Sequence, residues 1–213
     1  MDRSKTPVSR VVLGGVAATC AVMALAQAAA NVPNDPKAAK PLPVGSEVPK
    51  VKITNASKKS VSLKEVLNGK PTVLIFYRGG WCPFCTRQLA DLGKNEQKLR
   101  DMGFQIIAIS PDIADEGAKT TEKSELTYQL FSDSKADAMK AFGVAFRLDD
   151  KTFNLYKEKY GLDLESRSGE KHHILPVPAV FLINKEGKIT FVHSDPDYTK
   201  RLSGEALLKA ASN

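Results

Sequence analysis

The sequence is poor in aromatic residues and in cysteine, and it has no hydrophobic run long enough to cross a membrane. Aromatic side chains make up 7% of the 213 residues, and the basic residues behind the net charge of +7 are scattered rather than clustered. A nucleic-acid-binding surface needs clustered basic residues on one face, so we expect no nucleic acid partner. Only three cysteines occur, which excludes a small domain held together by several distant disulfides.

The first thirty residues have the pattern of a secretory signal peptide. A positive region at the start is followed by an apolar run at 11–26 and by small residues at 28–30 that offer a cleavage site. The apolar run is shorter than the roughly 20 residues that span a bilayer, and an uncleaved anchor helix is the alternative. Lipidation of Cys20 fits poorly, because apolar sequence continues past it. We expect residues 1–30 to be a signal peptide and the mature protein to be exported, to the periplasm if the source is a Gram-negative bacterium, without stable membrane association.

The rest of the chain divides into a linker and one domain. Residues 31–43 hold four prolines and are expected to form a flexible linker. In the domain at 44–213, apolar runs at 72–77, 104–109 and 179–184 are typical of strands buried on both faces. Shorter helices are expected at 62–67, where Ser62 and Glu65 form a capping box, and at 112–127, 135–142, 152–160 and from 203.

The order of these elements predicts the fold. A helix between the first two apolar runs makes a right-handed βαβ unit, and a turn at Glu186-Gly187 leads from the third run into an antiparallel strand at 188–193. We therefore predict an α/β protein with a thioredoxin-like fold, in which helices flank a central mixed β-sheet.

The pair Cys82 and Cys85 carries the chemistry that we predict. The motif Cys82-Pro83-Phe84-Cys85 lies where a strand ends and a helix begins. A helix start stabilises an anion such as a thiolate, and cysteines in this setting have lowered pKa values. Two sulfurs three residues apart on a first helical turn can cycle between dithiol and disulfide. We expect Trp81 to cover the pair on one side.

The stretch 44–211 resembles the alkyl hydroperoxide reductase / thiol-specific antioxidant (AhpC/TSA) family, the peroxiredoxin-like branch of the thioredoxin superfamily. Besides Cys82–Cys85 and its flanks, the resemblance rests on the segments 44–49, 108–112, 131–133 and 178–187. It implies a peroxiredoxin-type N-terminal extension before the core strands. By resemblance to thioredoxin-like folds in general, we also expect a cis peptide bond between Val177 and Pro178, packed against the cysteines; a trans proline at a strand start is the alternative.

Two departures from the family pattern concern the reactive centre. In the register Pro-x-x-x-Thr-x-x-Cys of peroxiredoxins, Arg78 stands at the proline, Cys82 at the threonine and Cys85 at the peroxidatic cysteine. Pro178 stands where the family has an arginine that holds the peroxide. Both changes favour a site for thiol–disulfide exchange, with Cys82 as the nucleophile. The register of the peroxiredoxin motif instead favours Cys85 as the residue that attacks the peroxide. Arg78 either supports a thiolate or lies on the surface.

Three functions follow from these residues. The leading hypothesis is an enzyme that reduces hydroperoxides through the Cys82/Cys85 dithiol, without a cofactor, and that a thioredoxin-type dithiol donor recycles. The second is a protein thiol–disulfide oxidoreductase on the same two cysteines. The third is a copper(I) carrier, in which His172 or His173 joins the thiolates. We interpret His193 as structural and assign no role to Asp195, Asp197 or Tyr198.

Overall fold

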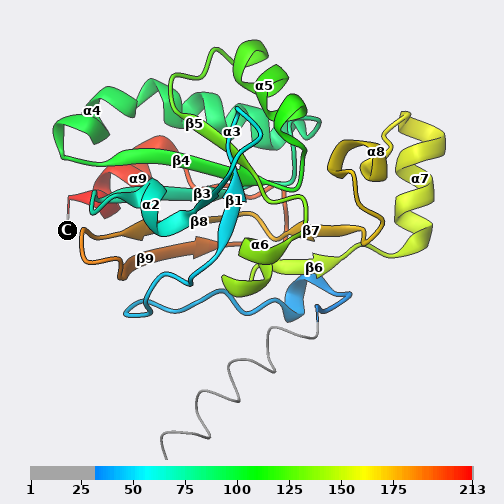
Figure 1. Ribbon diagram of the computed structural model, residues 1–213, viewed down its shortest axis with the longest axis horizontal. Helices are drawn as coiled ribbons and strands as arrows, with labels where there is room; N and C mark the ends of the chain where they lie inside the picture. The colour runs from blue at the N-terminus through cyan, green and yellow to red at the C-terminus, as the bar shows by residue number, and fades with distance from the viewer. Residues whose placement is uncertain (1–31, 213) are drawn as a thin grey trace, which may run out of the picture. The chain divides into compact units, whose positions relative to one another are not determined.

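The computed structural model of the protein describes residues 32–212, so the predicted signal peptide lies outside the described residues. A seven-stranded sheet in the order β2-β1-β5-β4-β3-β8-β9 forms its centre (Figure 1). The strands of this sheet are β1 (Lys52–Thr54), β2 (Ser60–Ser62), β3 (Thr72–Phe76), β4 (Gln105–Ser110), β5 (Gln129–Ser132), β8 (Ala179–Ile183) and β9 (Ile189–Ser194). A separate antiparallel pair is formed by β6 (Ala145–Arg147) and β7 (Ile174–Pro176).

The sheet is mixed, as the sequence predicts. Strands β3, β4 and β5 run parallel to one another, whereas β8 pairs antiparallel with β3 and β9 with β8. The N-terminal strands β1 and β2 and the short helix after them precede β3 in the chain and correspond to the expected extension. The parallel strands β3 and β4 end at the same edge of the sheet, where the chain turns into the segment that holds the two cysteines.

The helices agree with the predicted positions except after the cysteine pair and at Leu164–Ser168, a short helix that the sequence does not predict. One helix is expected after the cysteine pair, but the chain forms two, because the helix breaks at Asn95, whose side chain donates a hydrogen bond back to the Asp91 carbonyl over 3.0 Å. The helices are α2 (Leu63–Leu67), α3 (Pro83–Lys94), α4 (Glu96–Asp101), α5 (Ala114–Lys123), α6 (Asp137–Ala141), α7 (Asp150–Tyr160), α8 (Leu164–Ser168) and α9 (Gly204–Ala211).

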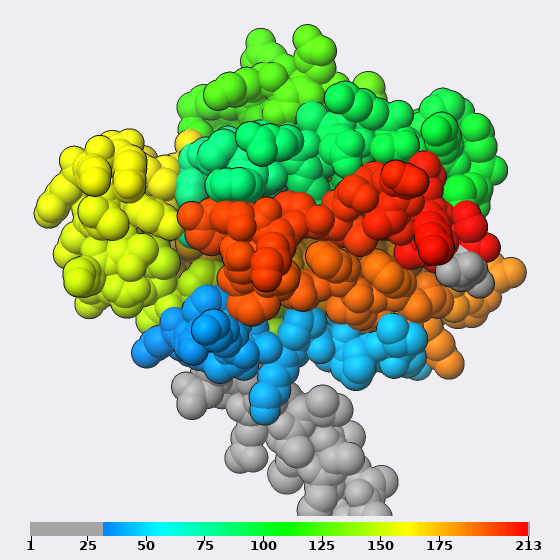
Figure 2. Space-filling view, turned by 180° about the vertical axis from the view of Figure 1, so that it is seen from behind, coloured from blue at the N-terminus to red at the C-terminus, as the bar shows by residue number. Residues whose placement is uncertain are grey.

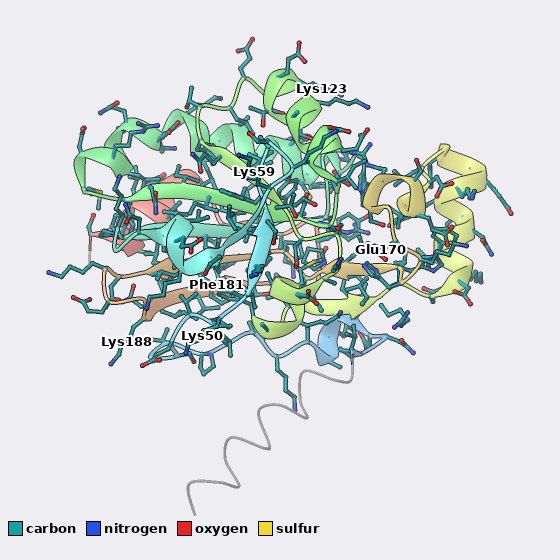
Figure 3. All side chains as sticks on the ribbon, viewed as in Figure 1. Lys50, Lys59, Lys123, Glu170, Phe181 and Lys188 are labelled. Carbon is teal, nitrogen blue, oxygen red and sulfur yellow. The ribbon has the colours of Figure 1, made fainter. Side chains whose placement is uncertain are left out.

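Both faces of the sheet are covered, which explains why its central strands are apolar throughout. Leu74 and Phe76 of β3 belong to a core that also holds buried residues of α2 and α6. Val73 and Ile75, which alternate with them, belong to a second core with α3, α4 and α9. Phe181 of β8, labelled in Figure 3 within the sheet, packs in the first core. Because side chains alternate along a strand, one short run supplies both cores.

The proline-rich residues 32–43 pack against the domain, in contrast to the mobile linker expected there. They contain the 3-10 helix η1 (Pro36–Ala38), and the Leu42 N–H donates a hydrogen bond to the Phe142 carbonyl over 3.0 Å. The backbone of Lys40 passes so close to Gly143 that a Cβ there would lie 2.0 Å from the Lys40 oxygen. This backbone approach is a tertiary contact that proline content does not reveal.

Between β6 and β7 the chain forms α7 and α8, which Figure 1 shows in yellow at one end of the central sheet. Both helices send side chains back towards the segment that precedes Cys82, as described below. Among the helices of residues 32–212, none is long and apolar enough to span a membrane.

Candidate active site

Cys82 occupies the N-cap position of α3, as the sequence predicts. Pro83 is the first residue of the helix, where its missing N–H costs no hydrogen bond. The Cys82 carbonyl accepts hydrogen bonds from the N–H groups of Cys85 and Thr86 over 3.0 and 3.1 Å. The first turn of α3 therefore carries both sulfurs, in the partial positive field of a helix start.

Two glycines shape the segment that leads to Cys82. Gly79 has a φ of +142°, and a Cβ there would lie 2.3 Å from the indole nitrogen of Trp81. A Cβ on Gly80 would lie 1.8 Å from the Thr120 hydroxyl oxygen of α5. The segment thus fits between Trp81 and α5 only because these two residues lack side chains.

A buried carboxylate, that of Asp112, holds the segment before Cys82 in place. The Gly80 N–H donates a hydrogen bond to Asp112 over 2.8 Å, and Arg167 of α8 donates two more over 3.1 and 2.9 Å. Burial raises the pKa of Asp112, which the hydrogen bonds and charge of Arg167 oppose. Asp112 belongs to the segment 108–112 of the family resemblance, so that segment supports the site through Gly80.

Both cysteines are free thiols and both are buried, Cys82 with 1% and Cys85 with 0% of its surface exposed. A hydrogen bond from the Cys85 side chain to the Cys82 sulfur lowers the pKa of Cys82 to about 6, with smaller contributions from the charges of Arg78 and Arg201. Burial raises the pKa of Cys85, and its hydrogen bond to Cys82 raises it further. At neutral pH the arrangement therefore favours a Cys82 thiolate beside a Cys85 thiol.

Arg201, a residue that the sequence interpretation missed, lies directly against the two sulfurs. Its Nη2 is 3.3 Å from the Cys85 sulfur and 4.0 Å from the Cys82 sulfur. The guanidinium is held by hydrogen bonds from Nη1 to the Gln88 side-chain oxygen over 3.1 Å and from Nε to the Tyr198 carbonyl over 2.7 Å. A cation thus stands at the dithiol, on the segment between β9 and α9.

Arg78 is buried, with 3% of its surface exposed, so the surface alternative for this residue is wrong. Its Nη2 donates a hydrogen bond to the Tyr156 hydroxyl of α7 over 2.9 Å. Its guanidinium carbon lies 5.1 Å from the ring centre of Trp81 and 4.3 Å from that of Tyr198. Aromatic faces attract a guanidinium at such distances, and together they keep the charge of Arg78 inside the protein near Cys82.

The segment 195–202 covers the dithiol. Figure 2 shows this part of the chain in orange-red, against the green-blue surface of the segment that holds α3. The ring of Tyr198 stands edge-on to that of Phe84, with 5.7 Å between the ring centres. Tyr198, to which the sequence interpretation assigned no role, is therefore part of the site, whereas Asp197 accepts hydrogen bonds from Thr199 within a turn. No local motif marks Tyr198 or Arg201 in the sequence.

The expected cis peptide bond before Pro178 is wrong. Residues 32–212 contain no cis peptide bond, so the Val177–Pro178 bond is trans and Pro178 directly precedes β8. The Val177 N–H donates a hydrogen bond to the Val144 carbonyl over 2.8 Å. A trans proline fits a strand start, which is the position that Pro178 has here. The predicted supporting role of Pro178 stays a prediction.

The two histidines considered for copper are bonded elsewhere. The His172 Nδ1 accepts from the Ile174 N–H over 2.9 Å, so its Nε2 donates to the Ser134 carbonyl at 2.6 Å. The His173 ring contacts Glu165 over 2.9 Å and stacks on Phe153 with 3.8 Å between ring centres. Within residues 32–212, no group of three or more His, Cys, Asp and Glu side chains is placed to hold a metal ion. The geometry therefore does not favour the copper(I) hypothesis.

A dithiol on the first turn of a helix that follows a central strand, in a sheet of this order, defines the class of thioredoxin-fold thiol oxidoreductases. The AhpC/TSA family model matches residues 44–192. The chain belongs to the AhpC/TSA family.

Relatives of two kinds support this assignment. A putative peroxiredoxin bcp of Haemophilus influenzae is 35% identical over 104 residues, which cover 49% of this chain and 66% of the relative. Peroxiredoxin Q of Triticum aestivum chloroplasts is 26% identical over 76% of this chain and 64% of its own length. A thiol-disulfide oxidoreductase ResA of Bacillus thuringiensis is 25% identical over 68% of this chain and 66% of its own length. The matches thus span about two thirds of the length of these relatives.

Solved structures confirm the fold. The peroxidoxin BcpB of Mycobacterium tuberculosis superposes with a TM-score of 0.60 at 20% identity, covering 79% of this chain and 94% of that one. Reduced Prx3 of Vibrio vulnificus in complex with hydrogen peroxide gives a TM-score of 0.64 at 18% identity, covering 80% of this chain and 99% of that one. The predicted thioredoxin-like α/β fold is correct.

Proposed function

We propose that the protein is a peroxiredoxin-type thiol peroxidase that reduces hydroperoxides through Cys82 and Cys85. The observation that carries this proposal is the position of Cys82 at the start of α3, with the thiol of Cys85 hydrogen-bonded to it and Arg201 4.0 Å away. The similarity to proteins named peroxiredoxins supports the same reaction.

Cys82 is the attacking residue in this proposal. Its thiolate attacks one oxygen of the hydroperoxide, the O–O bond breaks, and the products are a Cys82 sulfenic acid and an alcohol or, from hydrogen peroxide, water. The Cys85 sulfur then attacks the sulfenic sulfur, which releases the sulfenic oxygen as water and closes the disulfide. The pKa of Cys82, lowered to about 6, makes it the thiolate at neutral pH, whereas the raised pKa of Cys85 keeps that residue as the resolving thiol.

The two arginines supply positive charge to this reaction. Arg201 donates towards both sulfurs, and Arg78 lies buried close to Cys82. A fixed cation stabilises the negative charge that passes from sulfur to the leaving oxygen. In peroxiredoxins this charge is expected from an arginine at the position that Pro178 occupies here. In this chain Arg201 supplies it from the segment between β9 and α9.

Hydrogen peroxide consumption by the reduced protein tests the proposal. Cys82→Ser should remove the activity, whereas Cys85→Ser should complete one reaction and accumulate a sulfenic acid at Cys82, detectable by dimedone labelling and mass spectrometry. Because mass spectrometry assigns the label to a peptide, it also distinguishes a label on Cys82 or Cys85 from one on Cys20. If Cys82→Ser consumes peroxide at the rate of the unchanged protein, the proposed function is wrong.

Thiol–disulfide exchange on the same cysteines is a second candidate. It is favoured by the lowered pKa of the first cysteine of the motif, the residue that attacks in exchange reactions, and by the similarity to a protein named thiol-disulfide oxidoreductase. The two candidates differ in the oxidant. A hydrogen peroxide rate constant well above that of a free thiolate at the same pH supports the peroxidase, whereas a free-thiolate rate together with rapid oxidation by a protein disulfide supports exchange.

We also propose that the protein acts after export. The basic, apolar and small-residue regions of residues 1–30 support this proposal. N-terminal sequencing of the protein from a cell fraction outside the cytoplasm should give a start near residue 31. A full-length chain in the cytoplasm would contradict it.

A further inference from the structure

Within the described part of the chain, the two arginines at the dithiol have no carboxylate partner. Among the ion pairs of residues 32–212, none involves Arg78 or Arg201. The hydrogen bonds of Arg201 go to the Gln88 side chain, to the Tyr198 carbonyl and to the sulfurs. Arg78 donates to the Tyr156 hydroxyl, and its buried Nε has no partner. Both cations therefore face neutral groups and the two cysteines.

This arrangement is costly unless an anion is present. A buried charge without a counter-charge is strongly unfavourable, and aromatic faces and neutral acceptors offset only part of that cost. The anion that the site itself supplies is the Cys82 thiolate of the reduced form. Oxidation to a disulfide removes this anion. The buried guanidinium of Arg78 is then left without a counter-charge, whereas that of Arg201, which is partly exposed, is compensated in part by solvent. The electrostatics of the site therefore stabilise the reduced form over the disulfide, which makes the disulfide a strong oxidant, since a couple is oxidising when its reduced form is stabilised.

We infer that the Cys82–Cys85 disulfide is a strong oxidant. The protein transfers this disulfide to dithiols of other proteins and so acts as a disulfide donor. The inference rests on the proposed function, because the hydroperoxide is the oxidant that forms the Cys82–Cys85 disulfide. A thiolate of the partner attacks the Cys82 sulfur and forms a mixed disulfide, with Cys85 as the leaving thiolate. The second partner thiolate attacks the partner's own sulfur, which releases Cys82. The sum converts one hydroperoxide and one dithiol into an alcohol, a water and one partner disulfide.

The burial of the sulfurs defines the kind of partner. Cys82 has 1% of its surface exposed, and the segment 195–202 covers it. Arg201 of this segment lies 4.0 Å from the Cys82 sulfur, the sulfur that loses its negative charge in the disulfide form. Because so little of Cys82 is exposed, an extended chain that carries two cysteines fits the site better than a folded surface.

The equilibrium between the protein and glutathione tests the oxidising character. The oxidised fraction is measured by thiol alkylation and mass spectrometry over a series of glutathione ratios, with thioredoxin measured alongside. We expect a disulfide at least a hundredfold easier to reduce than that of thioredoxin. Arg201→Met and Arg78→Met should each make it about tenfold harder to reduce, which equals about 30 mV.

Two control variants separate charge from structure. Arg87→Met removes an exposed cation of α3 that stacks on Phe84, and it should leave the equilibrium unchanged. Arg78→Lys keeps the buried charge and should lie close to the unchanged protein, even where Arg78→Met is poorly folded. An equilibrium constant equal to that of thioredoxin, or one that neither Arg201→Met nor Arg78→Met alters, would overturn the inference.

Transfer is tested with a synthetic extended peptide that carries two cysteines. The protein disulfide is made once with hydrogen peroxide and once with diamide, and peptide oxidation is followed by mass spectrometry. Transfer from both preparations supports the whole sequence of steps. If diamide forms a disulfide that transfers but peroxide forms none, the peroxidase proposal fails and the inference stands. If both disulfides form and neither transfers, the inference fails and the peroxidase stands.

Discussion

The backbone N–H of Gly80 donates a hydrogen bond to the carboxylate of Asp112 over 2.8 Å, and thereby joins the segment before Cys82 to the end of β4. The same carboxylate accepts two hydrogen bonds from Arg167, which α8 contributes from the insertion between β6 and β7. Three distant parts of the chain therefore meet at one buried charge. The position of the dithiol depends on how well that charge is compensated.

Arg167→Met should destabilise the protein by about 3 kcal/mol at pH 7, because it leaves the buried Asp112 without its counter-charge. Burial already raises the pKa of Asp112 above the ordinary value of 3.8, and loss of the arginine raises it further. A group with a raised folded pKa is destabilising above its unfolded pKa. The loss should therefore grow as the pH rises from about 4 and be small below it. Urea unfolding over a pH series measures this.

The matched control is Lys58→Met. Lys58 and Asp115 form an ion pair with 2.9 Å between nitrogen and oxygen, but both side chains are exposed. Such a pair is worth less than about 1 kcal/mol. Equal losses for Arg167→Met and Lys58→Met would contradict the importance of the buried Asp112.

Gly80→Ala should destabilise the protein by about 1–3 kcal/mol, because its Cβ would lie 1.8 Å from the Thr120 hydroxyl oxygen. In a Thr120→Ala background, where that oxygen is absent, the cost should be smaller, although the Thr120 Cβ stays at 3.0 Å. A double-mutant cycle in urea gives the coupling. Gly117→Ala in α5 is the control, since a Cβ there meets no atom within 4 Å and alanine favours a helix. Equal costs for Gly80→Ala in both backgrounds would contradict the proposed clash.

The alkylation rate of Cys82 should rise with pH around a midpoint of about 6, the value to which the Cys85 hydrogen bond lowers its pKa. Cys85→Ala removes the largest cause of the shift and should move the midpoint upwards, and Arg201→Met should move it less far. Iodoacetamide labelling resolved by mass spectrometry follows Cys82 separately from Cys20. A midpoint near the ordinary cysteine value of 9.0 in the unchanged protein would contradict this account.

The reduced protein should become more stable relative to its Cys82→Ser variant as the pH rises from about 6 to 9. In this range the folded Cys82 is a thiolate, whereas the unfolded one still binds a proton. Stability rises with pH wherever the unfolded state binds more protons. The gain is complete above the unfolded pKa and is lost as the pH falls through the folded pKa of about 6. Thermal unfolding under reducing conditions measures it, and parallel pH curves for the two proteins would show that Cys82 does not ionise early.

Most of the fold follows from local patterns in the sequence. Buried strands such as Thr72–Phe76 consist of continuous apolar residues because helices cover both faces of the sheet, and the capping box of Ser62 and Glu65 marks the start of α2. The break between α3 and α4 at Asn95 was not predicted, because a single side-chain hydrogen bond to Asp91 distinguishes it from a continuous helix.

The candidate site was predicted only as far as it is local in sequence. Cys82, Cys85 and Trp81 adjoin one another in the chain, so their chemistry is visible in a motif. Arg167 and Arg201 reach the site only through tertiary packing, and neither stands in a pattern that sets it apart from other surface arginines. At Pro178 the error came from a resemblance: thioredoxin-like folds led us to expect a cis bond, whereas the bond at the start of β8 is trans.

The order of the chain determines when this site is complete. Arg201 follows Cys85 by 116 residues and stands near the C-terminus. During synthesis, both cysteines are therefore made long before the cation that contacts them and the segment 195–202 that covers them. A nascent or truncated chain that stops short of Arg201 therefore carries the dithiol without this cation and without the complete segment that covers it.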